Sequence, residues 1–131
     1  YIACILLLPD EVDPIWVILI SFLIGLLVDI FYNTAGVHAS ASVMIGYLRG
    51  YIIKFLFPTK GVENDITISL KDMGGERFVR YVAILTIIHH SMLFFVEAGG
   101  FQFFLITVLK IICSVIFTTF LIIILQYVRG N

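Results

Sequence analysis

Long apolar stretches separated by short polar connections dominate the sequence. Crossing a hydrocarbon core of about 30 Å takes about 20 residues of α-helix. Four stretches reach this length, and they run from about 15 to 32, from 38 to 57, from 78 to 96, and within 101 to 128. The pattern therefore predicts an all-α integral membrane protein, a polytopic helical bundle.

Sequence signals set the limits of the first two predicted helices. Asp13 is placed as an N-cap, and Pro14 occupies the first helical position, where its missing N–H costs nothing. Pro58 ends the second helix because a proline ring cannot continue it. The turn between the two helices, 33–36, is so short that we expect them to be antiparallel neighbours.

Composition agrees with a membrane protein. Hydrophobic residues make up 61% of the chain and charged residues 13%, with a mean hydropathy of +1.11, whereas a soluble domain carries about 25% charged residues. No basic footprint for nucleic acid is present. Cys4 and Cys113 both lie inside apolar runs, so no disulfide framework and no metal-binding cysteine pattern is indicated.

The first residues of the chain read as the end of a further helix. They are apolar from Tyr1 to Leu8, Pro9 follows, and there is no initiator methionine. We therefore expect 1–131 to be a single transmembrane domain that lacks its N-terminal first helix. About five helices are represented, the first of them truncated, and one full helix before them would give six spans.

The distribution of positive charge predicts the orientation. The segments 10–13 and 58–77 and the C-terminus share one face, whereas 33–36 and 98–100 share the other, which has no Lys or Arg. The first face carries Lys60, Lys71, Arg77 and Arg129. By the positive-inside rule, 58–77 is a cytoplasmic loop and the C-terminus is cytoplasmic. Within this loop, alternation from Ile66 to Lys71 predicts a short strand or extended segment.

Small and polar residues recur about every four positions, which places them on one face of each helix. Faces of this kind turn inward in membrane bundles, because small residues and interhelical hydrogen bonds hold the helices together. The four stripes are Ser21, Gly25, Asp29 and Asn33; His38, Ser42, Gly46 and Arg49 or Gly50; Thr86, His90, Leu93 and Glu97; and Thr107, Lys110, Ser114 and Thr118.

The polar segment DIFYNTAGVHAS, 29–40, stands between two membrane helices. Asp29 lies about one turn below the outer surface, where we expect Asn33, Thr34 or His38 to hydrogen-bond its carboxylate. Arg49 lies deeper, and it either extends to the cytoplasmic headgroups or pairs with an acid in the bundle.

Catalysis or metal binding is the first function to weigh. The candidate residues are Asp29, His38, His89, His90 and Glu97. The adjacent histidines point about 100° apart on a helix, so they do not bind one metal easily. The His-Glu-x-x-His motif and a nucleophile-elbow serine are both missing from the sequence. The residues favour a protein that is not an enzyme and has no cofactor.

A transport subunit and a scaffold remain. An outward-facing pocket built by Asp29, Asn33, His38 and Glu97 would suit a small polar ligand or a proton. The sequence has no internal repeat and no paired broken helices, which many transporters have. A scaffold that binds other membrane proteins through its helices suits the small-residue faces and the lack of a soluble domain.

The run SFLIGLLVDIFYNTAGVHASASVMIGYLRGYI, 21–52, resembles the core of the rod shape-determining MreD family, with its G-x-x-x-D-x-F-x-N-T-x-G-x-H-A signature followed by an arginine. The matching residues are Gly25, Asp29, Phe31, Asn33, Thr34, Gly36, His38, Ala39 and Arg49. The segment 81–101 is similar to the family's His-His helix that ends in Phe-Phe-x-Glu. The resemblance covers most of the chain.

The resemblance implies a six-helix protein of the bacterial inner membrane with a fold similar to the S components of energy-coupling-factor transporters. It implies a non-catalytic scaffold in the cell-elongation machinery for peptidoglycan. MreC is the first partner to expect, with MreB, RodA and its penicillin-binding transpeptidase as further members of the complex. The family has no established catalytic activity, so the motif residues are structural or interaction candidates. These are Asp29, Asn33, Thr34, Gly36, His38, Arg49, His89, His90 and Glu97.

Overall fold

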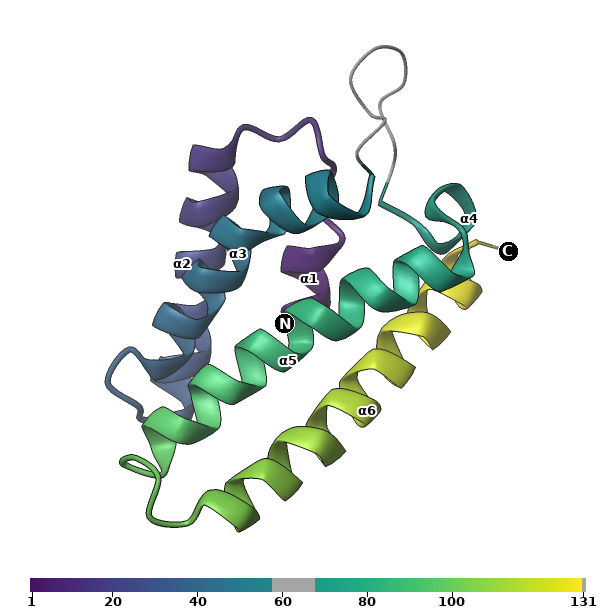
Figure 1. Ribbon diagram of the computed structural model, residues 1–131. Coiled ribbons are helices and arrows are strands. Elements are labelled where there is room, and N and C mark those ends of the chain that lie inside the picture. The colour runs from purple at the N-terminus through teal and green to yellow at the C-terminus, as the bar shows by residue number, and fades with distance from the viewer. Residues whose placement is uncertain (58–67, 131) are drawn as a thin grey trace.

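The computed structural model describes residues 1–57 and 68–130, and these residues form six helices and no strand (Figure 1). The helices are α1 (Ile2–Leu6), α2 (Pro14–Tyr32), α3 (Val37–Leu56), α4 (Leu70–Met73), α5 (Gly75–Glu97) and α6 (Phe104–Arg129). The all-helical fold predicted from the sequence is confirmed for the described residues.

Three helices of the described chain are long and apolar enough to cross a membrane: α2, α5 and α6. Three of the four membrane spans predicted from the sequence therefore correspond to helices of this kind. The second predicted span, α3, has 20 residues but is not among the three. It carries His38, Arg49 and Lys54, and the side chains of His38 and Arg49 contact partners on other helices.

The sequence signals that begin and end α2 are present in the structure. The side chain of Asp13 accepts a hydrogen bond from the backbone N–H of Ile15 at 3.1 Å, and Pro14 is the first helical residue. The helix ends at Asn33, whose φ of 53° is left-handed. The predicted boundaries of α2 therefore agree with the structure.

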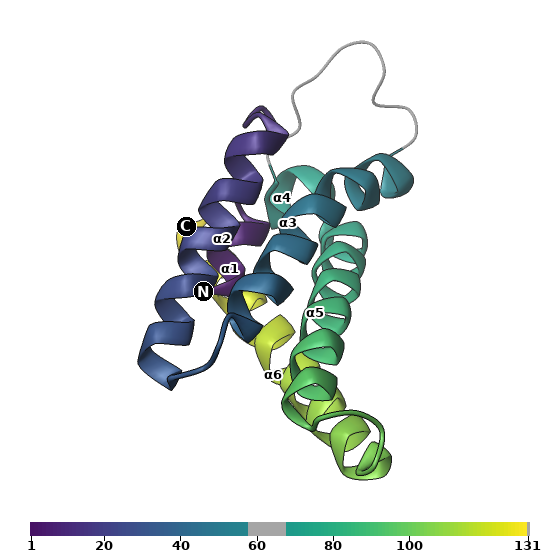
Figure 2. The ribbon, with the colours of Figure 1, turned by 90° about the vertical axis from the view of Figure 1, so that its left-hand side faces the viewer.

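The long helices form an open row in which α2 packs on α3, α3 on α5, and α5 on α6. Figure 1 shows α2 and α3 at one end of this row and α6 at the other, and Figure 2 shows α3 between α2 and α5. The short helix α1 contacts α2, α3 and α5. Neighbouring helices of the row are antiparallel, so the helix ends at Pro14, Leu56, Gly75 and Arg129 lie on the same side of it. We call this side the loop end and the opposite side the turn end.

The hydrophobic core lies where α1, α3, α4 and α5 meet. Its fully buried members include Ile5, Ile45, Phe78 and Leu85, and Ile122 is the contribution of α6. Moving an aliphatic or aromatic side chain of this size out of water into a protein core stabilises a fold by about 1.5–3 kcal/mol. In a membrane the same close contacts act through packing, because lipid tails are as apolar as these side chains.

The extended segment predicted for 66–71 is wrong in part. Residues 66 and 67 lie outside the described residues, but Leu70–Met73 form the helical turn α4. Ser69 begins this turn in an extended conformation, and its hydroxyl accepts from the N–H of Asp72 at 3.1 Å. The predicted loop 58–77 thus contains a capped turn of helix and the first residues of α5.

The polar stripe predicted for the last helix is also wrong in part. Thr107 is buried, but Lys110 is exposed, and Ser114 and Thr118 are half-buried. Most of the surface of α6 is open, because this helix packs on α5 and only lightly on α4. Lys110 therefore faces away from the described bundle and does not pair with Asp29 or Glu97.

Candidate functional site

The candidate site lies where α2 and α3 touch at their closest. The buried residues of α2 are Val17, Ser21, Gly25 and Asp29, spaced four apart on one face. A Cβ added to Gly25 would lie 2.5 Å from Cα of Ala39, so only glycine fits at this crossing. The stripe predicted for α2 is buried as expected as far as Asp29.

The turn between the helices places the carboxylate of Asp29 at the start of α3. Asn33 and Gly36 both adopt left-handed conformations, with φ of 53° and 81°, and the second of these favours glycine strongly. The backbone N–H groups of Asn33 and Thr34 both donate to the carbonyl oxygen of Asp29. The chain can thus reverse within four residues while Asp29 remains helical.

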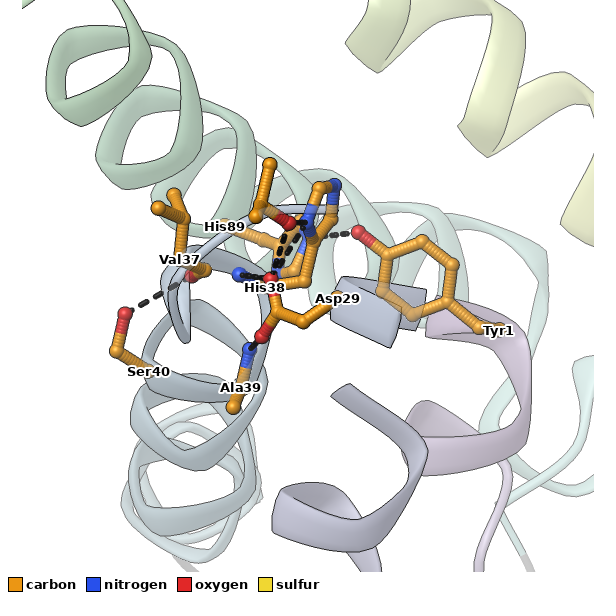
Figure 3. Close-up of polar contacts among 8 residues, drawn as sticks. Tyr1, Asp29, Val37, His38, Ala39, Ser40 and His89 are labelled. Carbon is orange, nitrogen blue, oxygen red and sulfur yellow. Dashed lines mark hydrogen bonds and ion pairs between the residues drawn. The ribbon is translucent and has the colours of Figure 1, made fainter. Parts of the chain in front are cut away.

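Asp29 caps α3 from a neighbouring helix. Its Oδ1 accepts from the backbone N–H of His38 at 3.0 Å, and its Oδ2 accepts from that of Ala39 at 2.8 Å (Figure 3). A helix normally obtains this bond from its own N-cap side chain, but the N-cap of α3 is Gly36, which has none. The negative charge at the start of α3 also suits the helix dipole.

Two side chains complete the surroundings of the carboxylate. The hydroxyl of Thr34 donates to Oδ1 at 2.5 Å, and Nδ1 of His38 lies 3.1 Å from the same oxygen. Asp29 is 3% exposed. Its carboxylate therefore has four polar neighbours inside the protein, which offsets the cost of burying it.

Two predicted members of the site lie apart from this cluster. The side chain of Asn33 is exposed, and its backbone conformation is what shapes the turn. Glu97, at the end of α5, is exposed as well. Of the three candidate partners for Asp29, the structure brings Thr34 and His38 to the carboxylate by their side chains. Among the described residues, no hydrogen bond or ion pair joins Glu97 or the side chain of Asn33 to the carboxylate of Asp29.

The two adjacent histidines of α5 have different neighbours. Nε2 of His89 lies 2.6 Å from the hydroxyl of Tyr1, as Figure 3 shows, and Nε2 of His90 lies 3.1 Å from Oγ1 of Thr118 on α6. Their rings are inclined at 79°. Each histidine thus connects α5 to a different element, and among the described residues no group of three His, Cys, Asp or Glu could hold a metal ion.

Arg49 lies at the other end of α3 and is 3% exposed. Its Nη2 donates to the carbonyl oxygens of Leu8 and of Pro9, the latter at 3.0 Å. Its Nε donates to the hydroxyl of Tyr81 at 3.1 Å, and that hydroxyl donates to the carbonyl of Leu6 at 2.9 Å. The guanidinium therefore satisfies carbonyls at the end of α1, where a helix leaves them without partners.

Sequence reasoning missed Tyr1 and Tyr81 as members of these networks. Both are tyrosines near or inside apolar runs, and Tyr81 is fully buried. A buried tyrosine hydroxyl usually has a hydrogen-bond partner. That rule marks Tyr81 as a residue with a polar role, but it does not say that Arg49, 32 positions earlier, is the partner.

No family model, no curated protein and no solved structure matches this chain. The resemblance to the MreD family therefore rests on the motif residues themselves. In the structure, the central residues of the motif join α2 to α3 at the turn end. They are Gly25, Asp29, Thr34, Gly36 and His38.

Proposed function

We propose that this chain is a non-catalytic scaffold subunit of the bacterial cell-elongation machinery, as the resemblance to the MreD family implies. The observation that carries the proposal is that the motif residues hold α2 and α3 together. The carboxylate of Asp29 accepts from two backbone N–H groups, a hydroxyl and a histidine ring. A residue engaged in this way holds two helices together and is not free to act on a substrate.

The proposal places the intact protein in the inner membrane with six spans, and with the loop end and the C-terminus in the cytoplasm. The positive charge of the loop end supports this orientation. A fold similar to the S components of energy-coupling-factor transporters belongs to the same proposal. The proposed partners are MreC first, and then MreB, RodA and its penicillin-binding transpeptidase.

The surface of α6 supports binding of a helical partner. In its most apolar stretch, 11% of the residues are buried inside the protein, whereas the corresponding share is 39% in α5. The exposed side chains of α6 include Leu109, Ile116, Phe117 and Phe120. Packing against a partner's helix would replace lipid contacts along this face by close contacts between side chains. We therefore assign α6 as the first partner-facing helix to test.

A substrate-binding subunit of a small-molecule transporter is the second candidate. It requires an outward-facing polar pocket. Asp29 and His38 contact each other, but among the described residues no hydrogen bond or ion pair connects Glu97 or the side chain of Asn33 to them. A cavity of the described residues lies at the loop end, between α2 and α3. The arrangement favours the scaffold.

The deciding experiment combines recovery of partners with site-specific crosslinking. The full-length tagged protein is extracted from its native membrane in a gentle detergent, and the proteins recovered with it are identified by mass spectrometry. A photo-crosslinking residue replaces Phe117 on α6 or, as a matched control, Leu27 on α2, which are 64% and 57% exposed. MreC or the cell-wall polymerase crosslinked at 117 supports the proposal. Recovery of an ATPase pair with a coupling subunit would overturn it in favour of the transporter.

A further inference from the structure

A cavity of about 470 Å³ opens between α2 and α3 at the loop end, away from the Asp29 cluster. Its position follows from the packing of the two helices. They are in contact at Gly25 and at Gly46, where an added Cβ would overlap Ser21. One turn later, a Cβ on Gly50 would meet nothing within 4 Å. Figure 1 shows α3 turning away from α2 toward its C-terminal end, and the residues that line the cavity belong to these diverging parts of the two helices or immediately precede α2.

The cavity has one apolar wall and one polar wall. The α2 side presents Ile15 and Ile18, whereas the α3 side presents Tyr47, Tyr51 and Lys54. The two tyrosine hydroxyls lie 3.2 Å apart, and both side chains are more than half exposed, at 53% and 59%. Tyrosine and lysine are the residues that anchor helices at the level of the lipid headgroups.

The described lining residues give the cavity a positive charge. Arg49 and Lys54 are its cations, and Asp10 is its carboxylate. The contacts of the Arg49 guanidinium include two backbone carbonyls and a phenol. Two cations against one carboxylate leave the described lining with one net positive charge. An anion in the cavity would therefore meet an excess of positive charge.

We propose that this cavity binds the headgroup of an anionic glycerophospholipid from the cytoplasmic leaflet. Basic pockets between membrane helices recognise such headgroups. The phosphate would lie against Lys54 and the hydroxyls of Tyr47 and Tyr51, with Arg49 beneath it. A volume of about 470 Å³ suits a headgroup, so the acyl chains extend outside along Ile15 and Ile18. The site uses none of the Asp29 cluster, so it does not depend on the scaffold role, but its place in the cytoplasmic leaflet rests on the orientation proposed above.

The test is native mass spectrometry of the purified full-length protein during titration with phosphatidylglycerol or with phosphatidylcholine carrying the same acyl chains. The wild type should retain phosphatidylglycerol preferentially. Lys54→Gln should weaken this retention about fivefold, the usual effect of one cation at the membrane surface. Lys110→Gln is the matched control, because it removes an exposed lysine from α6, away from the cavity.

A second variant fills the cavity without disturbing the fold. Gly50→Leu places a side chain where no atom lies within 4 Å of the new Cβ, so the variant should fold and yet lose its preference for phosphatidylglycerol. Equal retention of the two lipids by the wild type overturns the proposal. The same loss in Lys110→Gln as in Lys54→Gln also overturns it. Displacement of the lipid by millimolar inorganic phosphate would identify free phosphate as the ligand and overturn the lipid assignment.

Discussion

The carboxylate of Asp29 on α2 lies 2.8 Å from the backbone nitrogen of Ala39 on α3, ten residues later. A helix that begins with glycine is thus capped by its neighbour, and the cap is at the same time an interhelical contact. Separation of α2 from α3 would therefore expose the start of α3, and loss of the cap would loosen the pair. The start of one helix and the packing of two are coupled through a single side chain.

Replacement of Asp29 by Ala should lower the free energy of unfolding by about 2–3 kcal/mol, because it removes an N-cap and leaves buried N–H donors without partners. Asp29→Asn should recover part of this loss, since its one oxygen accepts a single bond of the two. Steric trapping in bicelles measures the unfolding free energy. Asp13→Ala is the matched control: Asp13 also caps a helix, but in an exposed position.

The loss in Asp13→Ala should stay within the ordinary range of an exposed cap, about 1 kcal/mol. Equal losses in Asp13→Ala and Asp29→Ala would mean that Asp29 contributes no more than a local cap. In that case the coupling between α2 and α3 would have to come from the small residues at Gly25 and Gly46 alone.

The two central glycines of α3 should respond to alanine in opposite directions. Gly46→Ala brings a methyl group into Ser21, and overpacking of this kind costs about 1–3 kcal/mol. Gly50→Ala meets open space, so it should stabilise the protein by about 0.5–1 kcal/mol through a better helix propensity. Thermal unfolding followed by circular dichroism distinguishes the two signs.

A compensating change tests whether the clash with Ser21 is the cause. Ser21→Gly removes both Ser21 atoms closest to the added methyl group. The double variant Ser21→Gly/Gly46→Ala should therefore regain most of the stability lost in Gly46→Ala. If the two changes simply add, the loss arises from something other than the contact of α2 with α3 at this point.

Local patterns in the sequence predicted the helices and the inward face of α2. Pro14, Asn33 and Gly36 act within a few residues, and a four-residue repeat is enough to align Ser21, Gly25 and Asp29. For this reason the boundaries of α2 and the burial of Asp29 were accessible without a structure.

Relations between distant parts of the chain were not accessible. Arg49 contacts carbonyls 40 and 41 positions earlier, and backbone carbonyls leave no signal in a sequence. The spacing of Lys110 fits a stripe of residues four apart. Among the long helices, however, α6 packs mainly on α5, so only a narrow face of it is buried, and Lys110 lies outside that face. The orientation of a helix at the edge of a bundle depends on its neighbours, which a sequence pattern does not count.

The histidines of α5 provide a test of structural against chemical roles. Their Nε2 atoms make the contacts with Tyr1 and Thr118, and the amide of glutamine reaches the position of Nε2, whereas that of asparagine does not. His90→Gln should therefore keep α6 packed on α5, and His90→Asn should lose about 1 kcal/mol. Recovery of partners is measured beside stability in the same pull-down.

The outcome separates the two roles directly. Stable His89→Gln and His90→Gln variants that recover their partners as the wild type does would fit a structural role for both rings. A stable variant that fails to support rod shape would contradict it, because glutamine keeps the hydrogen bond but cannot carry a proton as imidazole does.

Tyr81 connects three elements through one hydroxyl, so Tyr81→Phe should release α1. The change leaves Nε of Arg49 and the carbonyl of Leu6 without their partner in a buried position, at a cost of about 1–3 kcal/mol. Hydrogen exchange of the amides of α1 should become faster, whereas exchange in the part of α2 next to Asp29 should not change. Tyr47→Phe is the control, because that hydroxyl is exposed and contacts only the hydroxyl of Tyr51 among the described residues. Equal exchange of α1 in both variants would show that α1 is held by apolar packing of Ile5 and not by the Arg49–Tyr81 pair.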